Sequence, residues 1–250
     1  MPTSKQGSTQ KRGIASEAPG TAVKKRKSAS RSSTSAHVSP SIAAANVQQY
    51  LTRFRKGSST GGCEAAIMDD LLTVLGDGLS KREACQRLRK FIASYGVIRT
   101  FAGLREDRVD GLQPIVRHLQ EHRQELLRLL APADIVIQVE ALADACKMAG
   151  FNRNLSFATK CLCMLGRPVP IFSSEGKAYL RLKGSATYGD YLAAWFVAYE
   201  DVRADYEATA ARLMAESGGE PERKRGLTPA WVAMRGFDVH LMAVGGPMRS

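Results

Sequence analysis

From Ser41 onward, apolar residues return at the spacing of helical turns, and capping residues, glycines and prolines separate the segments. Ser80-Lys81-Arg82-Glu83 has the S-x-x-E form of a capping box, and Thr228-Pro229 places proline directly after a capping hydroxyl. The longest patterns predict single helices from Leu112 to Leu130 and from Tyr188 to about Met214, and no segment alternates as a strand does. The sequence therefore predicts an all-α fold of eight or nine helices.

The middle of the chain has well-marked helix ends. Asp134 is expected to cap a helix that ends at Gly150, and Asn154 is expected to cap the next helix, which ends at Gly166. The apolar segment Pro168-Val169-Pro170-Ile171-Phe172 follows, and a short helix is predicted after Ser173 or Ser174.

Residues 1–40 differ from the rest of the chain. They hold eight basic side chains, one acidic side chain and no aromatic residue, whereas the other 210 residues hold 28 basic and 23 acidic side chains. Such a segment buries too little apolar surface to offset its ordering entropy, so we expect a disordered basic arm before a single helical domain, 41–250. The arm's basic groups resemble a bipartite nuclear import signal, and a generic contact with phosphates or another polyanion is the alternative. These groups are Lys11, Arg12, Lys24, Lys25, Arg26 and Lys27.

Composition narrows the class of protein. No window approaches 18 consecutive apolar residues and no apolar leader is evident, so neither a membrane span nor a secretory signal is expected. The five cysteines are odd in number and mostly within helical patterns, which is typical of reduced cytosolic thiols. A cytoplasmic protein is expected, associated with the nucleoid or, if an import receptor reads the arm, nuclear.

Few signatures of catalysis or cofactor binding are present. No P-loop, dinucleotide fingerprint, G-x-S-x-G or H-E-x-x-H occurs. His118 and His122 are spaced i, i+4, but charged neighbours favour a solvated helix face, and Cys161-Leu162-Cys163 lacks the further ligands of a zinc site. We expect no cofactor and no metal.

Three short segments resemble bacterial proteins of the 8-oxoguanine DNA glycosylase fold, a helix-hairpin-helix class, and the pattern is clearest over 131–245. They are Ser156-Phe157-Ala158-Thr159-Lys160-Cys161-Leu162, then Pro170-Ile171-Phe172-Ser173-Ser174, and finally Arg235-Gly236-Phe237-Asp238-Val239-His240-Leu241. The resemblance implies a glycosylase-like helical fold, with Lys160 at a nucleophile's place and Ser173 at the place of the family's catalytic aspartate. The family's glycine-rich hairpin loop has only Ala149–Arg153 as a stand-in.

The departure at Ser173 bears on function, because serine without its own base cannot act as a general base at neutral pH. The leading expectation is therefore a nucleic-acid-associated protein without glycosylase activity. One alternative is an active lyase-type glycosylase that uses Lys160. Another alternative is a protein-interaction module or host-targeted effector, in which the arm is a targeting signal and the protein partner is unknown.

Contacts with nucleic acid are expected from the arm and from basic side chains of the helical domain, chiefly Lys81, Arg82 and Arg153. The aromatic residues Trp195, Phe196, Tyr199 and Trp231 have the residue type that stacks on an extruded base, but their helical spacing favours a place in the core.

Overall fold

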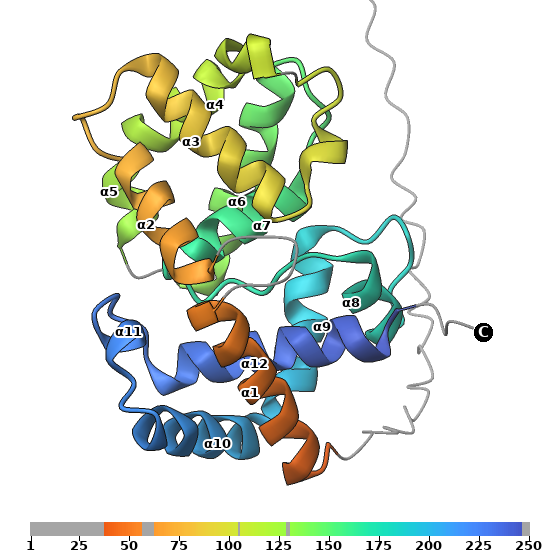
Figure 1. Ribbon diagram of the computed structural model, residues 1–250. Helices are drawn as coiled ribbons and strands as arrows, with labels where there is room; N and C mark the ends of the chain where they lie inside the picture. Colours follow the sequence, from red (N-terminus) through yellow and green to blue (C-terminus); the bar gives the residue numbers. More distant parts are fainter. Residues whose placement is uncertain (1–37, 57–62, 105, 129–130, 247–250) are drawn as a thin grey trace, which may run out of the picture. The chain divides into compact units, whose positions relative to one another are not determined.

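The computed structural model describes residues 38–56, 63–104, 106–128 and 131–246 (Figure 1). These residues form twelve α-helices and two 3-10 helices and, among themselves, no strand, which confirms the all-α class. The elements are α1 (Pro40–Lys56), α2 (Glu64–Val74), α3 (Lys81–Ser94), η1 (Ile98–Thr100), η2 (Glu106–Leu112), α4 (Gln113–Glu121), α5 (Arg123–Leu127), α6 (Pro132–Met148), α7 (Leu155–Met164), α8 (Ser174–Tyr179), α9 (Tyr188–Glu200), α10 (Arg203–Glu216), α11 (Glu220–Arg223) and α12 (Pro229–Val244). The predicted basic arm, including Lys11, Arg12 and Lys24 to Lys27, lies outside the described residues up to position 37.

The expected count of eight or nine helices is too low, mainly because two long patterns are each divided. The expected helix over 112–130 becomes α4 and α5, with a break at His122, and its first residue, Leu112, is the last residue of η2. The expected helix over 188–214 becomes α9 and α10, because Val202 leaves helical geometry at φ −124° and ψ 0°. Val202 is itself buried, so the apolar periodicity continues through the bend and hides it from a sequence reading.

Several predicted helix ends are confirmed. Ser80 and Glu83 form a reciprocal capping box on α3, and Thr228 caps α12 through the backbone N–H of Trp231. The predicted cap at Asp134 is wrong: α6 begins two residues earlier, at Pro132, and Asp134 lies in its first turn. Proline at the first helical position lacks only an N–H that would have no helical partner, so it extends the start of the helix.

The helices at the two ends of the described chain pack together. α12 lies against α1, α10 and α8 (Figure 1). Asn46 of α1 donates to the Tyr206 hydroxyl at 3.0 Å, and its amide nitrogen lies 3.3 Å from Nδ1 of His240. Gly236 of α12 permits this approach, because an added Cβ would lie 2.7 Å from a methyl carbon of Val47.

A buried ionic group joins α12 to the middle of the chain. Asp238 accepts from Nη1 of Arg235 at 2.5 Å, from Nε1 of Trp195 at 3.0 Å and from the backbone N–H of Ile171 at 3.4 Å. Burial raises the pKa of Asp238 to about 6, and its three donors counteract part of that rise. The carboxyl group therefore ties α9, α12 and the apolar segment before α8 to one another.

The aromatic side chains proposed as base-stacking candidates lie mainly in the core. Trp195, Tyr199 and Trp231 are buried, and Phe196 packs against the core as a partly buried ring. Trp195 stacks on Tyr199 with ring centroids 4.8 Å apart, and Trp231 meets Tyr50 edge-on at 5.7 Å. The structure therefore agrees with the prediction that these aromatic residues belong to the core.

The five cysteines are all free thiols, and all except the half-buried Cys63 are buried. Burial raises the pKa of Cys85 to about 11 and that of Cys146 and Cys163 to about 12. In the part of the chain that the structure describes, no helix is both long enough and apolar enough to cross a membrane.

Candidate functional site

The site develops around α7, whose start is fixed by Asn154. The Asn154 side chain accepts from the backbone N–H of Phe157 at 2.9 Å and donates to the hydroxyl of Thr100. α7 buries nearly every residue from Phe157 to Met164, and Lys160 is the half-buried exception. α7 is therefore buried on almost all sides, and the amine of Lys160 lies at its exposed edge.

Side chains from two helices, α7 and α9, hold the segment that follows α7. The hydroxyls of Tyr188 and Tyr191 donate to the carbonyls of Pro170 and Ile171, at 3.2 and 2.7 Å. The backbone N–H of Phe172 donates to the hydroxyl of Thr159 at 3.1 Å. Side-chain hydroxyls thus supply hydrogen-bond partners to this backbone in place of a neighbouring strand, and nothing in the apolar sequence indicated that tyrosines would be among them.

Ser173 is a helix cap. Its hydroxyl accepts from the backbone N–H of Gly176 at 2.9 Å and begins α8. The predicted short helix after this position is confirmed. The following residue, Ser174, donates its hydroxyl to the Glu175 carboxylate at 3.0 Å. Ser173 stands where the glycosylase resemblance implies an aspartate. The acidic residue nearest to it in the sequence is Glu175, which was not predicted as a site residue.

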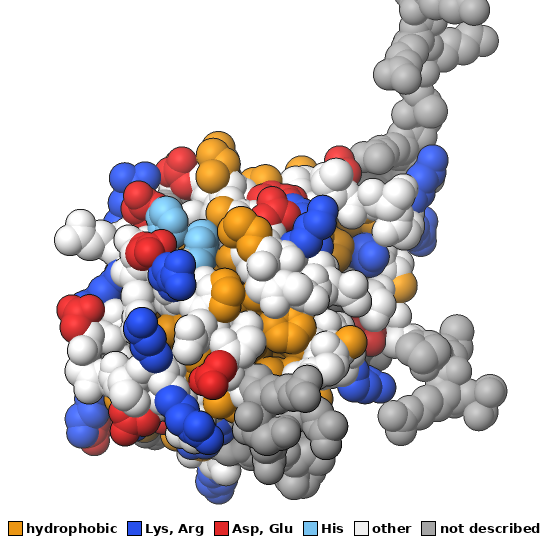
Figure 2. Space-filling view, turned by 90° about the horizontal axis from the view of Figure 1, so that it is seen from above, with side chains coloured by type: hydrophobic (Ala, Val, Ile, Leu, Met, Phe, Trp, Pro, Cys, Tyr) orange, Lys and Arg blue, Asp and Glu red, His pale blue; other side chains and the backbone are white. Residues whose placement is uncertain are grey.

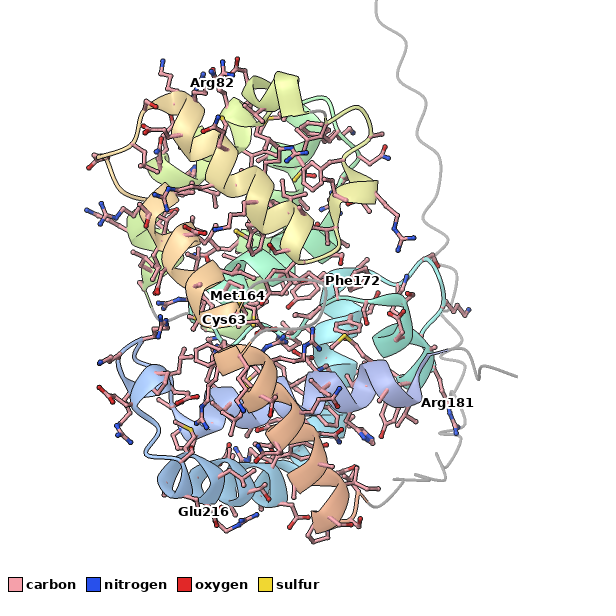
Figure 3. All side chains as sticks on the ribbon, viewed as in Figure 1. Cys63, Arg82, Met164, Phe172, Arg181 and Glu216 are labelled. Carbon is pink, nitrogen blue, oxygen red and sulfur yellow. The ribbon has the colours of Figure 1, made fainter. Side chains whose placement is uncertain are left out.

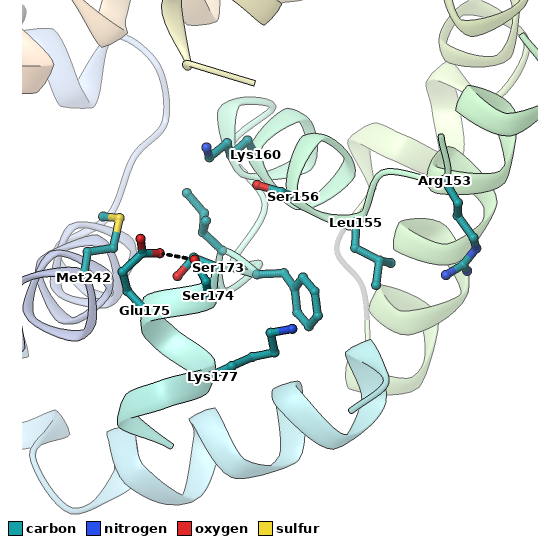
Figure 4. Close-up of a pocket in the computed structure, with 11 residues that line it drawn as sticks. Arg153, Leu155, Ser156, Lys160, Ser173, Ser174, Glu175, Lys177 and Met242 are labelled. Atoms are coloured by element: carbon teal, nitrogen blue, oxygen red, sulfur yellow. Dashed lines mark hydrogen bonds between the residues drawn. The ribbon is translucent and has the colours of Figure 1, made fainter. Parts of the chain in front are cut away.

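These elements border an open pocket of about 580 Å³, which we call the outer pocket (Figure 4). Its walls come from α7, α8, the segment between them, Met242 of α12 and Arg153 before α7. Lys160 and Ser156 lie on one side of it, and Ser173, Ser174 and Glu175 lie across from them (Figure 4). The remaining lining residues are Leu155, Ile171, Phe172 and Lys177. The structure thus brings the two residues singled out for catalysis, Lys160 and Ser173, to one cavity.

The environment of Lys160 alters its acid–base behaviour. Its Nζ donates to the backbone carbonyl of Tyr95 at 3.2 Å. Burial, followed by the nearby positive charge of Arg235, lowers the pKa of this amine from 10.5 to about 8. An amine with this pKa is partly neutral near physiological pH, and neutral amines attack carbonyl groups. The amine is therefore held at the edge of α7, where it is half-buried.

The outer pocket also has an aromatic and cationic wall. Nζ of Lys177 lies 5.1 Å from the ring centre of Phe172 and donates to the carbonyl of Gly184 at 3.3 Å. The Phe172 ring is half-buried and meets the ring of Tyr191 edge-on at 5.2 Å. One ring and one ammonium group are therefore held together at this wall.

The other predicted nucleic-acid contacts do not converge on this pocket. Arg153 lines it but is already bound to Glu140 and, at 2.6 Å, to Asp144. Lys81 and Arg82 are exposed at the start of α3, whereas Lys160 contacts Tyr95 just beyond its far end. The 14 residues of α3 span about 21 Å, so these two groups lie roughly that far from the Lys160 amine. Figure 3 shows Arg82 well away from Phe172.

The surface of the helical domain carries both signs of charge. On the face shown in Figure 2, Lys and Arg side chains are interspersed with Asp and Glu. On α3, Arg87 and Lys90 both bind Asp70, each at 2.6 Å.

Within the described ranges, no group of three or more His, Cys, Asp or Glu residues is arranged to hold a metal ion. The His118 and His122 rings lie 4.6 Å apart, and His122 contacts Glu125 at 3.0 Å.

Comparison of the chain with protein-family models, with curated proteins and with solved structures found no match. The functional argument therefore rests on the pocket itself.

Proposed function

We propose that the helical domain binds nucleic acid at the outer pocket and does not cleave the N-glycosidic bond. The observation that carries this proposal is the wall formed by Phe172 and Lys177 opposite the Lys160 amine, in a cavity of about 580 Å³. An aromatic face stacks on a base, and ammonium groups contact phosphate oxygens. The volume lies in the range typical of sites for small ligands, which accommodates a single nucleotide.

The absence of base excision in this proposal follows from Ser173. Its hydroxyl is occupied as the cap of α8, and a serine offers no proton acceptor at neutral pH without a base beside it. The resemblance to glycosylases places the catalytic acid at this position, so the proposed role is recognition of a nucleotide.

The binding test uses the full chain with two sets of substitutions. One variant replaces the six basic residues of the arm by Gln (Lys11, Arg12, Lys24, Lys25, Arg26 and Lys27). The other is Lys177→Met, with Lys147→Met, an exposed lysine of α6, as its matched control. Anisotropy of a labelled single strand, measured across a salt series, gives affinity and salt slope.

We expect Lys177→Met to weaken binding and to reduce the salt slope by about one, whereas Lys147→Met leaves both unchanged. Binding that disappears with the arm substitutions and is unaltered by Lys177→Met would refute a site in the outer pocket and would leave the arm as the sole contact.

A second candidate, lyase action on abasic DNA, is favoured by one specific observation, the lowered pKa of Lys160. In this reaction the neutral amine adds to the aldehyde of the ring-opened sugar, and loss of water gives an imine. Borohydride reduces that imine to a stable adduct, which gel electrophoresis detects. Lys160→Arg keeps the positive charge but cannot form the imine. A covalent adduct in the unmodified protein that is lost in Lys160→Arg would establish the lyase, and an adduct that persists would exclude Lys160.

A further inference from the structure

A second cavity adjoins the outer pocket on the inner side of Lys160. Its volume is about 100 Å³, room for about three waters at ~30 Å³ each. We call it the inner pocket. Lys160, Ile171 and Met242 line both cavities. The other polar residues that line the inner pocket are Arg53, Glu64, Ser94, Tyr95 and Arg235.

Two of these side chains are buried with hydrogen-bonding atoms that have no partner among the described residues. Glu64 is 6% exposed and no described donor is in hydrogen-bond geometry to its Oε2, because the nearby hydroxyl of Tyr95 donates to Sδ of Met164 at 2.6 Å. Arg235 is 4% exposed and its Nε donates no hydrogen bond, although its Nη1 binds Asp238. A buried acceptor and a buried donor without partners are costly, and both side chains line the same small cavity. This arrangement is typical of a site whose ligand supplies the missing hydrogen bonds.

The charges around the inner pocket indicate what charge a ligand must carry. Arg235 is paired with Asp238, and Arg53 lies 4.0 Å from Glu64. Lys160 forms no ion pair with a described carboxylate, so one positive charge is left over. A fitting ligand therefore carries one negative charge for the cationic groups and one hydrogen-bond donor for Oε2 of Glu64.

We propose that the inner pocket binds a small 2-hydroxycarboxylate, with its carboxylate held by Arg235, Arg53 and Lys160 and its hydroxyl donating to Glu64. A two- or three-carbon acid matches the volume of about 100 Å³. Hydrogen phosphate, as the dianion, brings a second negative charge that the single excess cation does not balance, and an amino acid brings a positive charge that leaves the excess on Lys160 unbalanced. The hydroxy acid satisfies both conditions, since it carries one negative charge and one hydroxyl donor.

The test is calorimetric titration of the full-length protein with glycolate at pH 7 and low salt, with acetate as the matched ligand that lacks the hydroxyl. We expect one saturable site for glycolate and affinity at least about tenfold weaker for acetate, because acetate leaves Oε2 of Glu64 without a donor.

Two variants locate the site. Arg53→Gln changes a side chain that is 41% exposed and that lines only the inner pocket, so the fold should tolerate it. Lys177→Met changes only the outer pocket. We expect Arg53→Gln to weaken glycolate binding by about tenfold or more and Lys177→Met to leave it unchanged. Circular dichroism confirms that both variants are folded.

Three results would each overturn the proposal. They are no saturable heat with millimolar glycolate, equal affinity for acetate and glycolate, and glycolate binding that is unaffected by Arg53→Gln. Loss of glycolate binding in Lys177→Met would likewise place the ligand in the outer pocket and contradict the assignment.

Discussion

Replacing Lys160 by Met should stabilise the protein, because the folded state holds this amine where its charged form is unfavourable. The pKa of the amine is lowered from 10.5 to about 8 on folding, mainly by burial. A difference of about 2.5 pH units corresponds to roughly 3.4 kcal/mol, at ~1.36 kcal/mol per unit, as the cost of keeping the lysine charged. Met fills similar space without a charge.

The net gain is smaller than this cost. Lys160→Met also loses the hydrogen bond from Nζ to the Tyr95 carbonyl, which contributes about 1 kcal/mol. The side chain is half-buried, so solvent screens part of the charge. We therefore expect the free energy of unfolding to rise by about 1–3 kcal/mol at pH 7.

The sign of the pH dependence follows from proton linkage. Between pH 8 and 10.5 the unfolded chain binds a proton at Lys160 that the folded chain has released. In the unmodified protein, this group's penalty is therefore full below about pH 8 and declines as the pH rises. The advantage of Lys160→Met should be largest at neutral pH and should shrink toward pH 10.

Urea unfolding of both proteins at several pH values from 6.5 to 9.5 measures this difference. Lys147→Met, at an exposed position of α6, is the matched control, and its stability should stay within about 0.5 kcal/mol of the unmodified protein. A loss of stability in Lys160→Met at pH 7, or an advantage that does not change with pH, would refute the reasoning. Confirmation would mean that the amine is retained at a cost in stability, as expected for a functional group.

Three further predictions concern the core. Asp238→Ala should cost about 3–5 kcal/mol in urea unfolding, because it leaves the buried Arg235 without its counter-charge; a cost below about 1 kcal/mol would contradict the pairing. Gly236→Ala should cost about 1–3 kcal/mol by the same measurement, because its Cβ would lie 3.3 Å from Cα of Val47 in a packed contact; an unchanged midpoint would show that α1 and α12 adjust freely. A thiol reagent at pH 8 should label Cys63 in the native protein and all five cysteines only in denaturant, because the other four are buried and in the reduced form; rapid native labelling of more than one would be inconsistent with that burial.

Much of the fold was predictable because helix signals are local. The capping box at Ser80, the caps at Asn154 and Thr228 and the helix end near Gly166 all follow from residue types a few positions apart. The bends at His122 and Val202 were not predictable, because the apolar spacing continues through both positions and no glycine or proline marks either one.

The site was predictable only in part for the same reason. Lys160 and Ser173 were identified from short motifs, and the structure places both on one pocket. Glu64 and Arg53 were missed, since nothing in the sequence shows that residues about a hundred positions before Lys160 line a cavity beside it. Arg235 and Asp238 were noted as part of a motif, but their burial as an ion pair depends on Trp195 and Ile171, which only the folded chain brings together.

The packing of α1 against α12 has a consequence for synthesis on the ribosome. Asn46 and His240 meet across 194 residues of chain. Translation typically adds ~5–20 residues per second, so α12 is completed roughly 10–40 s after α1 has been synthesised. Through that interval its apolar face, which includes Tyr50 and Phe54, is without its final cover. Helices α2 to α7 contact mainly their near neighbours in the chain, so they can assemble earlier, whereas α1 is completed only after α10 and α12 have been made.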